Sequence, residues 1–239
     1  MINKEVKALI ISTSTIYGSD FLEYIREEIK DFTQTDELIF IPFAQPSGIN
    51  YDDYTEKVKN ALQAHEIKVR GIHEFENKKE AIRDAKTIFV GGGNTFLLLK
   101  TLYELDLMTT LREAILSGTP YIGTSAGSNL TGQTIGTTND MPIVYPPSFE
   151  ALKILPFNLN PHYLEADPNS THKGETREQR IAEFLIQNDI AVLGLKEGSW
   201  LEILEGEITL KGSENAVWFS RKNKERIIES GMRMSSLLQ

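Results

Sequence analysis

The sequence contains no cysteine among its 239 residues. Disulfide bonds, thiolate metal sites and mechanisms that use a cysteine nucleophile are therefore excluded. There are only four histidines, and none has the partner spacing of a metal site. We therefore expect no metal and no cofactor.

Long apolar runs and basic runs are also missing. No stretch approaches the ~18 consecutive apolar residues that a membrane span needs, and the formal net charge is -9. An acidic chain without a basic run is poorly suited to a phosphate backbone. We expect a cytoplasmic monomer or homodimer that binds neither nucleic acid nor membrane, and an acidic substrate would have to meet a few local cations.

The chain alternates between two hydrophobic periods, with apolar residues three or four apart in segments 18–31, 51–65, 95–105 and 107–117. Strand-like runs occupy 6–12, 37–43, 67–72, 87–90, 119–124 and 190–195. Short strands with tight turns follow residue 197. The pattern predicts one α/β domain over residues 1–239, with three layers, a mainly parallel doubly wound sheet and a short antiparallel C-terminal extension.

Three unusual clusters directly follow predicted strands: residues 91–94 (GGGN), Ser125, and residues 196–198 (KEG). Doubly wound sheets bind ligands beyond the carboxyl ends of their strands. The longest irregular stretch, 132–176, is also expected to be functional because long loops in compact domains usually are. The three clusters therefore predict a site at this edge of the sheet.

Residues 123–127 (GTSAG) have the Gly-x-Ser-x-Gly spacing of a nucleophile elbow. Such an elbow needs a strand, a sharp turn that holds the serine, and a helix, with small residues where Cβ atoms would collide. Gly123, Ala126 and Gly127 meet that demand. The alternative is a strand-to-helix turn whose serine only caps the helix.

A serine hydroxyl needs a base to become a nucleophile. His65 and His73 have charged neighbours and are interpreted as surface residues, and His172 is expected on a loop. His162 ends a short apolar segment and follows Pro161, which fixes the local backbone. We predict that His162 is the base.

The chain resembles peptidase E, the family of α-aspartyl dipeptidases in the class I glutamine amidotransferase-like superfamily. The matching segments are 90–95 (VGGGNT), 123–127 (GTSAG), 137–142 (TTNDMP), 160–162 (NPH), 173–178 (KGETRE) and 196–198 (KEG). The resemblance implies a flavodoxin-like, amidotransferase-like fold and cleavage of dipeptides with an N-terminal aspartate. It also implies Ser125 as nucleophile, His162 as base, and active-site roles for Asp140 and Glu197.

The third member of the triad stays open between these two carboxylates. Asp140 lies in a loop rich in threonine and asparagine, whereas Glu197 follows a predicted strand. A rigid strand end favours Glu197 as the group that orients the imidazole. An Asx-turn for Asp140 and an exposed turn for Glu197 are the structural alternatives.

Acyl transfer also requires hydrogen-bond donors for an oxyanion. We predict that the N–H groups of Gly92 and Ala126 supply them, because glycines let the backbone approach closely. Asn94 is assigned to substrate binding at the same turn. A phosphate cradle at the triple glycine is disfavoured because no Gly-Lys-Ser/Thr follows it.

Thr176 and Gln179 form the pattern of a capping box, so a helix is expected to begin there with Arg177 as its first residue. Arg177 and Arg180 then oppose the helix dipole, a conflict that a bound anion would relieve. We predict that Arg177, with Arg180 nearby, binds the substrate carboxylate. The alternative is a solvated arginine paired with Glu175 or Glu178.

The predicted function is hydrolysis of small acidic dipeptides, and of some related short substrates, through an acyl-enzyme on Ser125. Two alternatives remain at this point. One is a cyanophycinase-like hydrolase of an aspartyl polymer, and the other is a non-catalytic binding module of the same fold.

Overall fold

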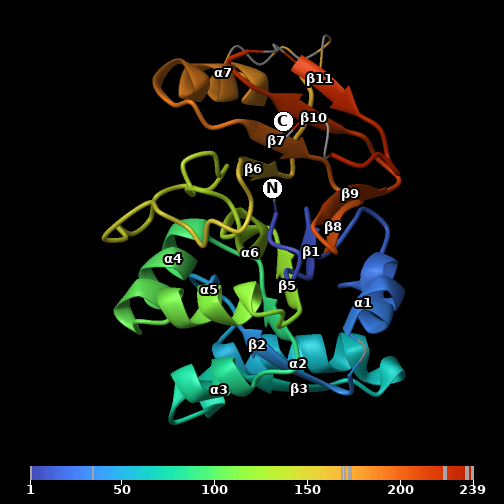
Figure 1. Ribbon diagram of the computed structural model, residues 1–239, viewed down its shortest axis with the longest axis vertical. Helices are drawn as coiled ribbons and strands as arrows, with labels where there is room; N and C mark the ends of the chain where they lie inside the picture. The colour runs from blue at the N-terminus through green and yellow to red at the C-terminus, as the bar shows by residue number, and fades with distance from the viewer. Residues whose placement is uncertain are drawn as a thin grey trace.

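The computed structural model describes residues 2–33, 35–167, 169, 171, 174–222, 225–234 and 237. This part of the chain forms two β-sheets, and the larger sheet has seven strands. In spatial order they are β3 (Lys68–Gly71), β2 (Glu37–Ile41), β4 (Ile88–Val90), β5 (Tyr121–Thr124), β1 (Ala8–Ile11), β8 (Ser199–Leu204) and β9 (Glu207–Gly212). The first five run parallel, whereas β8 and β9 extend the sheet antiparallel beyond β1 (Figure 1). The predicted parallel sheet and antiparallel extension are confirmed.

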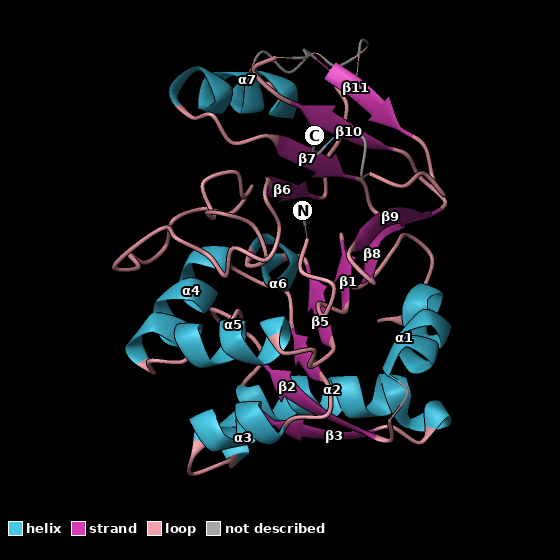
Figure 2. Cartoon of the chain, viewed as in Figure 1, coloured by secondary structure: helices cyan, strands magenta, loops and turns pink. Residues whose placement is uncertain are grey.

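Helices cover both faces of this sheet (Figure 2). They are α1 (Arg26–Thr33), α2 (Tyr51–Leu62), α3 (Lys78–Asp84), α4 (Thr95–Glu104), α5 (Met108–Leu116) and α6 (Ala126–Asn129), with short 3-10 helices at Glu23–Ile25, Gln63–His65 and Ile72–Glu74. Successive side chains of a strand point to opposite faces. Ala8 and Ile10 of β1 accordingly join the core under α3 to α6, while Leu9 and Ile11 join the core under α1 and α2.

The second sheet departs from the expectation. Its strands among the described residues are β11 (Glu225–Ile228), β10 (Ala216–Phe219), β7 (Val192–Leu195) and β6 (Asn158–Pro161), and helix α7 (Arg177–Gln187) lies beside them (Figure 1). The predicted strand at 190–195 is present as β7, but it pairs with β6 and β10 in this second sheet, which the prediction of one main sheet did not include. Strand β6 contains two asparagines and a proline, residues that are depleted in strands, so the sequence pattern does not predict this strand or its pairing with β7.

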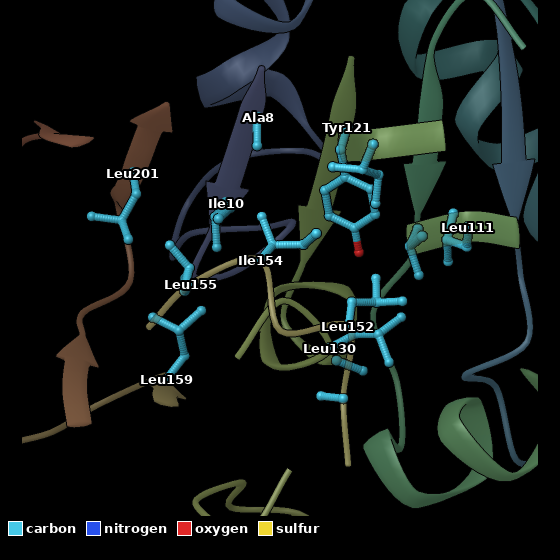
Figure 3. Close-up of a cluster of buried hydrophobic side chains, with 14 of the residues drawn as sticks. Ala8, Ile10, Leu111, Tyr121, Leu130, Leu152, Ile154, Leu155, Leu159 and Leu201 are labelled. Atoms are coloured by element: carbon cyan, nitrogen blue, oxygen red, sulfur yellow. The ribbon is translucent and has the colours of Figure 1, made fainter. Parts of the chain in front are cut away.

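A single buried cluster connects the two sheets (Figure 3). Ala8, Ile10 and Leu201 reach it from the larger sheet, Leu155 reaches it from the segment that leads into β6, and Leu159 reaches it from β6 itself. All five side chains are fully buried. This packing brings the start of the β6–α7 connection to the carboxyl ends of the parallel strands.

The turn after β5 is as crowded as the spacing of small residues predicts. A Cβ atom on Gly127 would lie 2.3 Å from the Val90 carbonyl oxygen, and one on Gly123 would lie 2.7 Å from the Gly127 oxygen. The buried Tyr121 hydroxyl donates a hydrogen bond of 2.6 Å to the same Gly127 oxygen. Glycine at these positions lets α6 pack directly on β4 and β5.

We expect Tyr121→Phe to lower the free energy of unfolding by about 1–3 kcal/mol, because the buried Gly127 carbonyl loses its hydroxyl donor without any change in ring packing. Tyr103→Phe is the matched control, since the Tyr103 hydroxyl also donates to a carbonyl but at an exposed site. Urea unfolding of both variants measures the difference. Equal losses would show that the Tyr121 hydrogen bond does not brace the turn.

Candidate active site

Ser125 lies in the sharp turn between β5 and α6. Its backbone dihedrals are φ 52° and ψ -106°, a strained conformation for a residue with a side chain. The Ser125 N–H donates to the carbonyl oxygen of Ile11 at 3.0 Å, which ties the turn to the end of β1. The strand, the strained serine and the helix together have the form of a nucleophile elbow.

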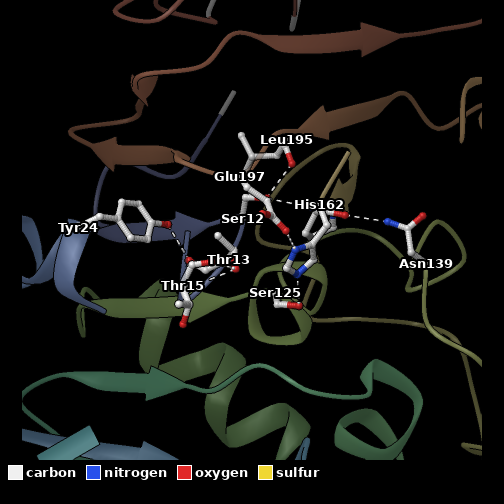
Figure 4. A network of polar contacts seen from close by, with 10 residues as sticks. Ser12, Thr13, Thr15, Tyr24, Ser125, Asn139, His162, Leu195 and Glu197 are labelled. Carbon is white, nitrogen blue, oxygen red and sulfur yellow. Dashed lines mark hydrogen bonds and ion pairs between the residues drawn. The ribbon is translucent and has the colours of Figure 1, made fainter. Parts of the chain in front are cut away.

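Three side chains form a hydrogen-bonded line at this turn (Figure 4). His162 Nε2 lies 2.8 Å from Ser125 Oγ, and His162 Nδ1 lies 2.7 Å from Glu197 Oε1. His162 directly follows β6 and Glu197 lies shortly after β7, so the second sheet carries both residues to the serine of the first. Serine, imidazole and carboxylate in this order can generate a nucleophile and stabilise the imidazolium that forms.

The structure places Asp140 away from this line. Its Oδ2 atom accepts hydrogen bonds from the Thr95 N–H at 2.7 Å and the Thr95 hydroxyl at 2.5 Å. Asn94 caps the same helix α4 through the Leu97 N–H, and its Nδ2 donates to the Met141 carbonyl. Asp140 and Asn94 thus join the 138–142 segment to the start of α4, and their polar contacts there are structural.

Backbone contacts fix the position of His162, whose φ of 54° is also positive. The His162 N–H donates to Ser12 Oγ at 2.9 Å, and Ser12 Oγ donates to the Leu195 carbonyl at 2.7 Å. Asn139 Nδ2 donates to the Pro161 carbonyl at 2.7 Å (Figure 4). Sequence reasoning missed Ser12 and Asn139, although Ser12 ends a predicted strand at the site edge and Asn139 lies in a matching segment.

The backbone of Gly92 lies against the nucleophile. A Cβ atom on Gly92 would be 3.1 Å from Ser125 Cβ, so a side chain there would crowd the serine. Among the described residues, none accepts a hydrogen bond from the N–H of Gly92 or Ala126. Both groups are therefore free to bind an oxyanion formed beside Ser125 Oγ.

Arg177 is the first residue of α7, and the predicted capping box between Thr176 and Gln179 is present. Burial lowers the pKa of the Arg177 guanidinium, and the negative charge of Glu197 opposes that shift. Arg177 Nη1 is buried and has no hydrogen-bond partner among the described residues. Arg180, in contrast, is exposed and lies 3.7 Å from Glu175.

The described part of the chain contains neither a metal-binding cluster nor a membrane-spanning helix. His172 and Lys173, which precede α7, lie outside the described residues. No group of three or more histidine, aspartate or glutamate side chains in the described segments is placed to hold a metal ion. No helix there is long and apolar enough to cross a membrane.

The α/β fold and the Ser125–His162–Glu197 line define a serine hydrolase. Residues 8–211 match the family described as peptidase family S51. The chain belongs to this family.

Full-length relatives agree with that assignment. The chain is 45% identical over 231 residues to peptidase E of Streptomyces coelicolor, a match that covers 96% of this chain and 94% of the relative. It is 44% identical over 215 residues to a Drosophila melanogaster protein named "Probable alpha-aspartyl dipeptidase", with 88% of each chain covered. The crystal structure of a peptidase from an acI-B1 actinobacterium shares the fold, with a TM-score of 0.70, 16% identity and coverage of 95% and 96%.

Exchanging the two carboxylates for amides should separate their roles. We expect Glu197→Gln to lower kcat by about 10³ to 10⁴-fold, because a neutral amide does not stabilise the imidazolium or fix its tautomer. Asp140→Asn should cost much less in kcat, since the Asp140 carboxylate accepts hydrogen bonds from Thr95 and none from His162 among the described residues. Steady-state kinetics on Asp-Leu measures both effects. A larger kcat loss for Asp140→Asn would reverse the assignment.

Proposed function

We propose that this chain hydrolyses dipeptides whose N-terminal residue is aspartate, through an acyl-enzyme on Ser125. The Ser125–His162–Glu197 line supports the reaction type, and the two sheets that supply it support a single hydrolytic domain. The names of the relatives support the substrate class. The observation that carries the aspartate preference is the half-buried Arg177 side chain, whose Nη1 atom is buried and has no partner among the described residues.

The reaction proceeds in two halves. Ser125 Oγ attacks the carbonyl carbon of the aspartyl residue while His162 Nε2 takes its proton, and the carbonyl oxygen becomes an oxyanion beside the Gly92 and Ala126 N–H groups. The imidazolium then gives the proton to the leaving amine, and the C–N bond breaks. Water attacks the ester with His162 again as base, and aspartate leaves Ser125.

Arg177 supplies the cation that an acidic substrate needs in a protein of net charge -9. A guanidinium can make two parallel hydrogen bonds to a carboxylate. Its location at the first turn of α7 adds exposed backbone N–H groups and the positive end of the helix dipole. A substrate without the aspartyl carboxylate would leave this buried donor unpaired, which costs binding free energy.

Hydrolysis of Asp-Leu, Glu-Leu and Ala-Leu tests the proposed activity and its selectivity. We expect the wild type to prefer Asp-Leu, and Ser125→Ala to lose on the order of 10⁴-fold or more in kcat, because the attacking oxygen is gone. Circular dichroism should show an unchanged fold. Near-normal turnover by Ser125→Ala would contradict the serine mechanism, and equal cleavage of the three dipeptides would contradict the aspartate preference.

Arg177→Ala should lower kcat/KM for Asp-Leu by about 10 to 150-fold, from charge-assisted hydrogen bonds that contribute roughly 1.5 to 3 kcal/mol. Arg177→Lys should recover only part, because lysine lacks the planar fork. Arg180→Ala should lower kcat/KM for Asp-Leu less than Arg177→Ala does, because the Arg180 guanidinium is exposed and lies near Glu175. The measurement is kcat/KM for Asp-Leu and Ala-Leu. An Arg177→Ala protein with wild-type selectivity would show that the carboxylate binds elsewhere.

A further inference from the structure

Two side chains hold the carbonyl group of Gly92 in one orientation. The Tyr54 hydroxyl donates to this oxygen at 3.2 Å, and Gln45 Nε2 donates to it at 2.9 Å. Tyr54 comes from α2, and Gln45 follows β2. In the sheet, β2 and β5 lie on opposite sides of β4, so the Gly92 carbonyl points toward β2 and away from the strand that carries Ser125.

The orientation of this carbonyl sets that of the next N–H group. Among the described residues no peptide bond is cis, and in a trans peptide the C=O and the following N–H point in opposite directions. The Gly93 N–H therefore points toward the β5 side, where Ser125 lies, and no described residue accepts a hydrogen bond from it. Gly93 has φ 141°, and a Cβ there would lie 2.3 Å from the Ala44 oxygen, so only glycine fits.

We propose that Gln45 and Tyr54 are positioning residues for catalysis, which hold the Gly92–Gly93 peptide so that the Gly93 N–H joins those of Gly92 and Ala126 as an oxyanion donor. The inference rests on the proposed acyl transfer at Ser125. If the peptide turned over, the Gly92 carbonyl oxygen would face the developing negative charge and repel it. The two donated hydrogen bonds oppose that rotation.

The Tyr54 hydroxyl is suited to this role. The side chain is buried, and burial raises the pKa of Tyr54 to about 12, so the hydroxyl keeps its proton and can donate at neutral pH. The ring packs edge-on against Phe40 with 4.9 Å between centroids. Tyr54→Phe therefore removes the donor and keeps the packing.

The test compares Tyr54→Phe, Gln45→Met and the double variant, each without one or both donors. We measure kcat and KM for Asp-Leu, the affinity for free aspartate, and the rate at which an uncharged fluorophosphonate labels Ser125. Removal of a whole oxyanion donor costs about 10² to 10³-fold in kcat. These variants loosen a donor without removing it. We therefore expect kcat and the labelling rate to fall about 10-fold in each single variant and up to 100-fold in the double variant.

A positioning role predicts that KM and aspartate affinity stay within about twofold of wild type, since the oxyanion exists only after attack. Tyr103→Phe is the matched control, because it removes a hydroxyl-to-carbonyl hydrogen bond far along α4 from Gly92. If the double variant does not fold, the single variants carry the test.

The outcomes separate this inference from the proposed function. If kcat and the labelling rate of every folded variant match those of Tyr103→Phe, the inference is overturned, while Ser125 remains the nucleophile. Equal losses in kcat and aspartate affinity would also overturn it, because they indicate general damage to the site. A wild type that is labelled but does not cleave Asp-Leu would contradict the proposed substrate, and the labelling rates would still decide the inference. A wild type that is neither labelled nor active would contradict both.

Discussion

The hydroxyl of Ser12 is the contact on which the geometry of the site depends. It accepts a hydrogen bond from the His162 N–H and donates one to the Leu195 carbonyl. Ser12 follows β1 of the larger sheet, whereas Leu195 is the last residue of β7 in the smaller sheet and His162 directly follows β6. Because Ser12 is fully buried, water cannot replace these bonds, and the two sheets must meet in a register that brings imidazole to serine.

The site also stores strain in its backbone. Ser125 and His162 both have positive φ, which costs roughly 1–2 kcal/mol for a residue with a side chain. Each is held by a backbone hydrogen bond to the end of the β1 region, through Ile11 for the serine and Ser12 for the histidine. The same short segment therefore restrains both reacting groups, and the 2.8 Å between them follows from that shared support.

Local patterns were enough to predict the parts of the structure that depend on neighbours in sequence. The alternation of periods predicted the parallel strands, and small residues around Ser125 predicted the crowded turn. Pairing between distant segments was not accessible in the same way. Strand β7 pairs with β6, whose asparagines and proline are untypical of a strand. A rigid strand end favoured Glu197 as the partner of His162, but sequence spacing does not reveal that Asp140 contacts Thr95.

In the proposed function, the arrangement of charges links specificity to catalysis. Glu197 serves His162 by direct contact, and its negative charge also favours the charged form of the half-buried Arg177, which burial disfavours. In the proposed function, a bound aspartyl carboxylate gives Arg177 a second anion and fills the hydrogen-bonding capacity of Nη1. A dipeptide without that carboxylate displaces water and leaves a charged donor unpaired. Discrimination by an unsatisfied buried polar group is stronger than discrimination by pocket size, because desolvation is not recovered. An acidic protein can therefore select an acidic substrate with one cation that is left unpaired until the substrate binds.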